Sequence, residues 1–287
     1  MRKISLLLLV SLLSVPALAN HYADTYVIPA VGHVEGANGA VWMSDLSIRN
    51  FGTAPLTVQL IVIESGFDTT NNVFPLNSDA DADASVTVNP GSTVQLRDVM
   101  RGHRGMTNNL GALIVGGNQP FAVTSRAYSN SMPLGQTVPA ARDFLDNSLG
   151  TADNTSTAYI PGIVSNAGAR TNVGFVAGSA GSATEAMTIE VSVRNATGGV
   201  VGTRSITIPA GRFAHMQFPV GSFAQGAFDI GSADFRITQG EGVVVPYASV
   251  IDNRTGEASY LMGVFPPTGA PAATSLFRTI FGGATDR

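Results

Sequence analysis

Cysteine is absent from the 287-residue sequence, tryptophan occurs once, and charged residues make up only 13% of the chain. Ordinary globular domains carry about 25% charged residues, so this chain is poor in charge. The absence of cysteine excludes a disulfide framework, a thiolate-bound zinc or iron–sulfur site, and a thiol nucleophile. Lysine occurs only as Lys3, which excludes a phosphate-binding loop of the Gly-x-x-x-x-Gly-Lys type.

The first 19 residues have the form of a cleavable export signal. Arg2 and Lys3 supply positive charge, an apolar run follows, and Ala17-Leu18-Ala19 forms a small-x-small cleavage pattern. The apolar run is about ten residues long, which is too short to cross a bilayer as a helix. No later apolar run reaches 18 residues. We therefore expect a periplasmic or secreted protein whose mature part has no membrane span.

The charge balance argues against a nucleic-acid partner. Once Arg2 and Lys3 are removed with the signal, 14 cationic residues remain against 20 acidic ones, a net charge of −6. Binding to phosphate backbones depends on clustered cations, which this composition does not supply. The one local basic concentration, Arg97, Arg101 and Arg104, encloses Asp98. We expect a surface salt-bridge cluster there rather than a site for an anionic partner.

Alternating polar and apolar residues dominate the rest of the chain. Residues 56–63 and 187–193 alternate with a period of two and are rich in Val, Ile and Thr. Further short segments of this kind are separated by Gly, Pro, Asn and Asp, and no amphipathic helix of ten residues follows the signal. This spacing of short strands and turns predicts an all-β protein rather than alternating strands and helices.

The chain also contains an internal repeat. Six segments recur in the same order, among them Ile28-Pro29 with Ile160-Pro161, Ser44-Asp45-Leu46 with Thr171-Asn172-Val173, and the turn glycines Gly91 and Gly211. Each copy spans roughly 110 residues, the size of an immunoglobulin-like sandwich. We therefore predict two tandem immunoglobulin-like antiparallel β-sandwich domains. The expected division is a signal at residues 1–19, modules at 20–140 and 158–265, a linker at 141–157 and a tail at 266–287.

The first copy resembles a repeat module of exported bacterial proteins. The residues that carry the resemblance are Ile28-Pro29, Gly36-Ala37-Asn38-Gly39, Trp42, Ser44-Asp45-Leu46 and Asn50-Phe51-Gly52. The sequence departs from that module at Phe51, where the module has a proline, and the second copy lacks the tryptophan. The resemblance implies a tandem immunoglobulin-like β-sandwich fold. It implies no activity, because the same sandwich serves many functions.

An insertion distinguishes the first copy from the second. The spacing from Thr57 to Gly91 exceeds that from Thr188 to Gly211 by 11 residues, and the extra residues fall in a loop. This loop contains Asp79, Asp81 and Asp83, a spacing found at the start of calcium-binding loops. The glycine and glutamate that complete such a loop are missing. Calcium binding by these three carboxylates is therefore one hypothesis, and a solvated acidic loop is the other; no other cofactor is expected.

The tail carries a second candidate site. After a proline-rich stretch, the apolar residues Leu276, Phe277, Ile280 and Phe281 occur close together. They either pack back onto their own sandwich or pair with the exposed sheet edge of a protein partner, including a second copy of the chain.

We interpret the tryptophan and the histidines as structural or solvent-exposed residues and not as parts of a binding site. Trp42 precedes an alternating strand, which favours a position in the core over an exposed platform for a sugar ring. The same interpretation applies to Tyr247 and Tyr260. No metal-ligating spacing connects His33 and His103, so we expect both to be solvated loop residues.

No hydrolase signature is present, and the acidic residues are not paired by any recognisable motif, so we do not expect an enzyme. The sequence favours an exported, non-catalytic protein that mediates protein association or adhesion at the cell envelope. The alternative is a carbohydrate-binding module, or an accessory domain of a hydrolase, with a glycan as its partner. Exposure of Trp42 and neighbouring tyrosines would favour this alternative.

Overall fold

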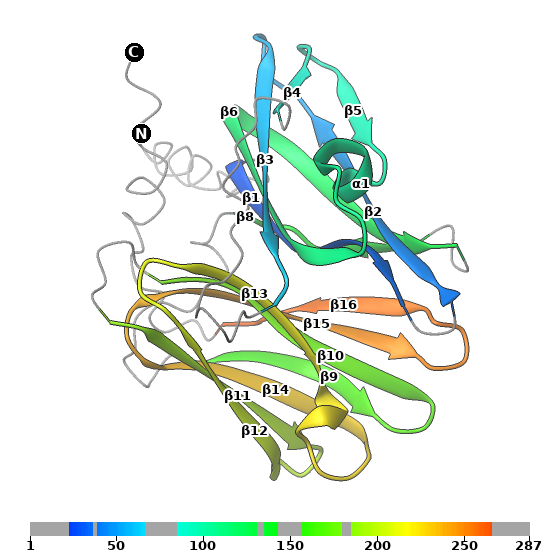
Figure 1. The fold of residues 1–287 in the computed structure, drawn as a ribbon, viewed down its shortest axis with the longest axis vertical. Helices are drawn as coiled ribbons and strands as arrows, with labels where there is room; N and C mark the ends of the chain where they lie inside the picture. Colours follow the sequence, from blue (N-terminus) through cyan, green and yellow to red (C-terminus); the bar gives the residue numbers. More distant parts are fainter. Residues whose placement is uncertain are drawn as a thin grey trace, which may run out of the picture.

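The computed structural model describes residues 23–36, 39–66, 85–130, 135–142, 157–179 and 185–265. These residues form several sheets of almost entirely antiparallel strands (Figure 1), so the predicted all-β class is confirmed. Within the described part of the chain, every helix is too short or too polar to cross a membrane. The proposed signal at residues 1–19 lies outside the described residues.

The N-terminal half, residues 23–142, is organised around one long strand. Its elements are β1 (Ala23–Glu35), β2 (Val41–Arg49), β3 (Leu56–Glu64), β4 (Ser85–Val88), β5 (Thr93–Leu96), α1 (Val99–Arg104), β6 (Asn109–Ser129), β7 (Gln136–Val138) and β8 (Ala141–Arg142). The first part of β6 pairs with β1 and β3, and its second part pairs with β2 and β7. Leu113 from the first part and Val123 from the second belong to the same apolar core, so β6 is a strand of both layers that enclose this core.

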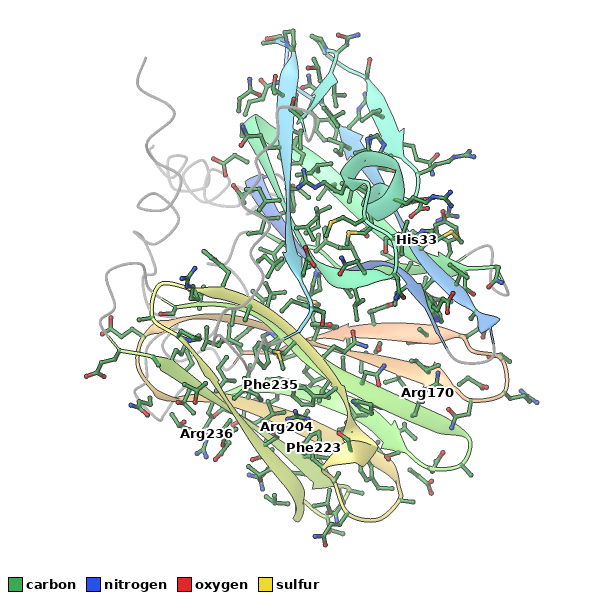
Figure 2. The ribbon with its side chains drawn as sticks, viewed as in Figure 1. His33, Arg170, Arg204, Phe223, Phe235 and Arg236 are labelled. Carbon is green, nitrogen blue, oxygen red and sulfur yellow. The ribbon has the colours of Figure 1, made fainter. Side chains whose placement is uncertain are left out.

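The C-terminal half, residues 157–265, has two separate four-stranded sheets. Its strands are β9 (Ala158–Ser165), β10 (Ala169–Ser179), β11 (Met187–Asn195), β12 (Val200–Ile208), β13 (Phe213–Pro219), β14 (Phe228–Gln239), β15 (Gly242–Asp252) and β16 (Ala258–Met262), with the short helix η3 (Val220–Ser222) after β13. The sheets have the orders β13-β10-β15-β16 and β12-β11-β14-β9. Apolar residues such as Phe175 and Phe235 fill the space between them. Figure 2 shows Phe235 inside this core and the next residue, Arg236, directed outward, as strand alternation requires.

The two halves share one pattern of strand pairing. The path β4-β3-β6-β1 corresponds to β12-β11-β14-β9, and the pairings of β5, β2, β6 and β7 correspond to β13-β10-β15-β16. Matching side chains have matching roles. Ser44 Oγ accepts a hydrogen bond from Gly32 N–H at 3.0 Å, and Thr171 Oγ1 accepts one from Val164 N–H at 2.9 Å. Gly91 and Gly211 occupy equivalent turns with φ of 67° and 66°, a conformation that favours glycine.

An apolar contact joins the two halves. The face of sheet β13-β10-β15-β16 that points away from the C-terminal core lies against the N-terminal half (Figure 1). Nine buried residues form what we call the apolar interface cluster: Val27, Ile63, Ala112, Ile114, Ala141, Val176, Phe213, Val243 and Val245. Ala141, which we had assigned to the linker, pairs in β8 with Val27 of β1. Separating the halves would expose these apolar residues to water, so the cluster favours their association.

This arrangement predicts that the halves unfold together. Phe213→Ala removes a buried ring from the C-terminal side of the interface, and we expect a loss of about 3–5 kcal/mol in the free energy of unfolding. Trp42 is the only tryptophan of the chain and lies on β2 of the N-terminal half, close to the C-terminal half, so its fluorescence reports both unfolding of the N-terminal half and separation of the two halves. During urea denaturation, the midpoint seen by Trp42 should fall in the Phe213→Ala variant.

A matched control is Ile230→Ala on β14, where the side chain is 59% exposed and a change within about 0.5 kcal/mol is expected. An unchanged Trp42 midpoint in Phe213→Ala, with earlier loss of the strand signal in circular dichroism, would show that the halves unfold independently.

Candidate functional site

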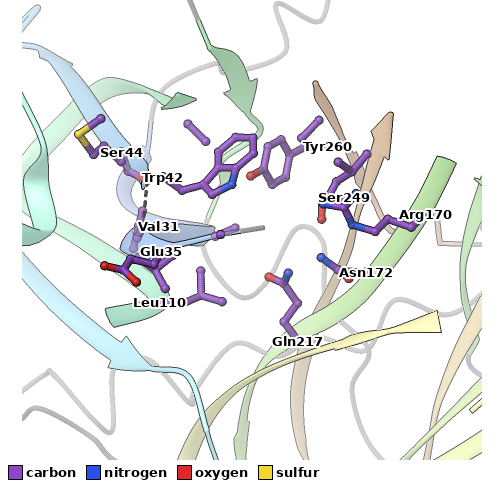
Figure 3. Close-up of a pocket in the computed structure, with 18 residues that line it drawn as sticks. Val31, Glu35, Trp42, Ser44, Leu110, Arg170, Asn172, Gln217, Ser249 and Tyr260 are labelled. Carbon is purple, nitrogen blue, oxygen red and sulfur yellow. Dashed lines mark hydrogen bonds between the residues drawn. The ribbon is translucent and has the colours of Figure 1, made fainter. Parts of the chain in front are cut away.

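A cavity of about 360 Å³ opens where the contact between the halves ends (Figure 3). One side is formed by the hairpin of β1 and β2, including Val31, Glu35 and Trp42. The other side is formed by β10, β13, β15 and β16 of the C-terminal half. We call this space the interface cavity. Its volume lies within the range of small-molecule binding sites, roughly 300–1,000 Å³.

The C-terminal wall of the interface cavity continues the face that makes the apolar contact. Alternate residues of β10 and β15 point toward the N-terminal half. Val176 and Val245 on this face belong to the apolar interface cluster. Farther along the same strands, the face carries Asn172, Arg170 and Ser249, which line the cavity. Along these strands, the face therefore changes from apolar residues in contact with the N-terminal half to polar residues that line the cavity.

Two aromatic rings border the interface cavity. Trp42 of β2 and Tyr260 of β16 are both half-buried and both line the space, and Figure 3 shows their rings at one end of it. We had expected Trp42 in a core, but it packs beside Gly36. A Cβ at that position would lie 2.7 Å from Cδ1 and Nε1 of the indole. The glycine therefore makes room for the ring, and one part of the indole remains available to a ligand.

Behind the polar wall runs a buried chain of hydrogen bonds. The ring of Tyr247 crosses Gly174, where a Cβ would lie 2.8 Å from its Cε1 atom. The Tyr247 hydroxyl donates to Gln217 Oε1 at 2.9 Å and lies 2.7 Å from His215 Nε2. Since its single proton goes to Gln217, the hydroxyl oxygen accepts from His215 Nε2–H. The amide oxygen of Gln217 is thereby engaged, and its NH₂ group is left to face the cavity (Figure 3).

Burial keeps these groups neutral. It lowers the pKa of His215 to about 3, although the nearby Pro29 carbonyl opposes the shift. Burial likewise raises the pKa of Tyr247 well above its ordinary value and that of Tyr260 to about 12. The cavity wall therefore carries no tyrosinate or imidazolium at neutral pH.

A second polar cluster lies on the N-terminal half, around Asp45. Arg126 donates to Asp45 Oδ2 at 2.6 Å, and the Asp98 N–H donates to Oδ1 at 2.9 Å. Burial would raise the pKa of Asp45, but these bonds and one from Tyr128 lower it below its usual value. His33 Nδ1 lies 2.9 Å from Asp98 Oδ2. His33 is thus part of β1 and bonded to a carboxylate, not the solvated loop residue that we expected.

This second cluster is closed on itself. Each carboxylate has a cationic, imidazole or backbone partner within the cluster. His103 lies in α1. In the described ranges, no group of three or more His, Cys, Asp or Glu side chains is arranged to hold a metal ion. We therefore assign the Asp45 cluster to stability.

The two sites predicted from the sequence lie outside the described residues and stay predictions. Asp79, Asp81 and Asp83 lie outside the described residues, and so do Leu276, Phe277, Ile280 and Phe281. Sequence reasoning missed Arg170, Asn172 and Gln217, which occupy polar positions of strands and look like solvent-facing residues. One signal was available: the unbroken apolar run Val243-Val244-Val245 indicates a strand buried on both faces.

Comparison with protein families, with characterised proteins and with solved structures finds no match to this chain. The comparisons therefore supply no activity, ligand or partner. What the chain can bind has to follow from the shape and chemistry of the interface cavity.

The buried His215 predicts a pH dependence of stability. Its pKa of about 3 in the folded protein lies below its value of about 6.5 in the unfolded chain. Between these values the unfolded state binds a proton that the folded state does not. The contribution of neutral, buried His215 to the free energy of unfolding is fully present above pH 6.5. As the pH falls toward 3, the free energy of unfolding decreases by up to about 1.4 kcal/mol per pH unit.

Urea denaturation of the parent protein and of His215→Gln, measured from pH 7.5 to pH 4, isolates this contribution. Glutamine does not titrate, and its amide can still donate to Tyr247. Carboxylates titrate in both proteins, so only the difference between the two slopes belongs to His215. The parent should lose stability more steeply than the variant. Parallel pH profiles would mean that His215 is not buried as described.

Proposed function

We propose that this chain is an exported, non-catalytic protein of two immunoglobulin-like modules that binds a saccharide in the interface cavity. The observation that carries the proposal is the half-buried position of Trp42 beside Tyr260 in a cavity that is mainly apolar and has a few polar side chains on its C-terminal wall. The C–H face of a pyranose ring packs on an aromatic ring, while its hydroxyls need hydrogen-bond partners close by. Both requirements are met by residues of one cavity.

The polar residues of the cavity suit hydroxyl groups. Asn172, Gln217 and Ser249 offer amide and hydroxyl groups on the C-terminal wall, and Ser44 lies on the N-terminal side. Ser249 is buried and Asn172 and Gln217 are half-buried, so their side chains are held by the sheet. Such ordered polar groups lose little freedom when a ligand binds. The apolar interface cluster holds the two sides of the cavity at a fixed distance.

Binding is better supported than hydrolysis. Glycosidases need two carboxyl groups on either side of the scissile bond. Among the residues that line the interface cavity, Glu35 alone carries a carboxylate, and it is exposed. Asp45 and Asp98 are engaged in the second cluster. The cavity therefore offers contacts for a sugar but only one of the two carboxyl groups that hydrolysis needs.

This proposal takes up the alternative that the sequence left open. Adhesion at the cell envelope would proceed through a glycan bound between the modules. Protein association stays a prediction, and so does the part that Leu276, Phe277, Ile280 and Phe281 would play in it, because the structure does not describe these residues. The export signal at residues 1–19 stays a prediction as well.

Binding should depend on the two rings. A glycan array should identify an oligosaccharide that binds the protein, and calorimetry should then give its dissociation constant. Trp42→Ala and Tyr260→Ala each remove an aromatic face, and we expect binding to weaken about tenfold or more in each variant.

The control is Phe51→Ala, which removes an aromatic ring that is 49% exposed and does not line the cavity; its affinity should equal that of the parent. Binding of the same oligosaccharide with parent affinity in Trp42→Ala would place the sugar elsewhere and reject the proposal.

A further inference from the structure

We infer that the saccharide is acidic, and that its carboxylate binds to Arg170 on the C-terminal wall of the interface cavity. This inference rests on the proposed function and adds the chemical class of the ligand. The class is a pyranose that carries a carboxylate, as a hexuronic acid does.

The first observation is the position of Arg170. It lies on β10, is half-buried and lines the cavity (Figures 2 and 3). Arg170 Nη1 donates to Asn253 Oδ1 at 2.6 Å. In the part of the chain that the structure describes, no carboxylate forms an ion pair with it. A guanidinium has five N–H donors, so most of the donors of Arg170 are left for a ligand.

Neighbouring acidic residues do not neutralise this charge. Asp252 is on the adjacent strand, but its carboxylate accepts the N–H groups of Arg254 and Thr255 in the turn after β15. Those bonds go to Oδ1 and lower the pKa of Asp252. The residue paired with Arg170 across the sheet is Ile251, not Asp252. By contrast, Arg126, Arg194 and Arg236 each pair with a carboxylate. Arg170 is the cation that faces the cavity without such a partner among the described residues.

The second observation is that Gln217 adds a donor to the same wall. Its amide oxygen accepts the Tyr247 hydroxyl, so the amide presents N–H groups toward the cavity. Arg170 and Gln217 together make this wall rich in donors, which favours acceptor groups on the ligand. A carboxylate is the acceptor that fits a planar guanidinium with two parallel hydrogen bonds.

Glu35 fixes the orientation of such a ligand. It lies on the N-terminal side of the cavity, opposite the wall formed by β10 and β13 (Figure 3). A ligand carboxylate is repelled on that side and attracted by Arg170 on the other. With its acid on Arg170, the ligand can present its ring to Trp42 and Tyr260. A carboxylated pyranose supplies both groups in one residue.

The test compares acidic and neutral oligosaccharides by calorimetry with the full chain. The probes are the trimers of galacturonate, glucuronate and mannuronate, the methyl esters of the same trimers, and neutral trimers of the corresponding hexoses. At least one uronate trimer should bind, and its methyl ester and neutral counterpart should bind about ten- to a hundredfold more weakly, as expected for a hydrogen bond to a charged group. The difference should shrink as the salt concentration rises.

Arg170→Gln should abolish the preference for the acid, so that the acidic and the neutral trimer bind with equal affinity. Arg170→Lys keeps the charge but not the two parallel donors, and should retain part of the preference. Arg254→Gln is the matched control, because Arg254 is exposed in the turn after β15 and does not line the cavity. It should bind like the parent. Melting curves of all three variants verify that each is folded.

The outcomes separate the two proposals. Equal affinity for acidic and neutral trimers, or an acid preference that survives in Arg170→Gln, overturns the assignment to Arg170 and leaves saccharide binding in place. Absence of binding by every saccharide, on the array and in calorimetry, overturns the proposed function together with this inference.

Discussion

The fold and the candidate site both depend on one apolar contact, in which the outer face of sheet β13-β10-β15-β16 packs on the N-terminal half. Val176, Phe213 and Val245 face Val27 and Ile114 across this contact, all of them buried. Moving this sheet away from the N-terminal half would expose its apolar outer face to water. The contact therefore holds the β1–β2 hairpin and the C-terminal sheet at a set distance, and the interface cavity occupies the place where the contact ends.

The same contact explains how two similar halves come to differ in chemistry. Asp45 and Asn172 are equivalent in the internal repeat. In the N-terminal half, Arg126 and the Asp98 backbone enclose Asp45. In the C-terminal half this face turns toward the other module, and Asn172 lines a cavity. One strand pattern thus yields a closed ion pair in one copy and an open polar wall in the other.

The sequence predicted those features of the fold that depend on residues close together in the chain. Alternation predicted strands such as β11, and turn glycines such as Gly211 were found by comparing the copies, because strand period and positive φ depend on a few neighbouring residues. Contacts between the halves join residues far apart in the chain. Trp42 was expected in a core, since nothing near it in the sequence shows that its neighbours belong to the other module. Arg170 carries no signal in the sequence for the same reason.

The most direct measurement is a crystal structure of the protein with a bound uronate trimer. We expect density for a pyranose ring against Trp42 and Tyr260, with its carboxylate on the Arg170 guanidinium. We also expect that the two halves keep the arrangement seen here, because the cavity is already formed. A trimer bound at any other surface, or a cavity that is filled by the protein's own side chains, would contradict this expectation.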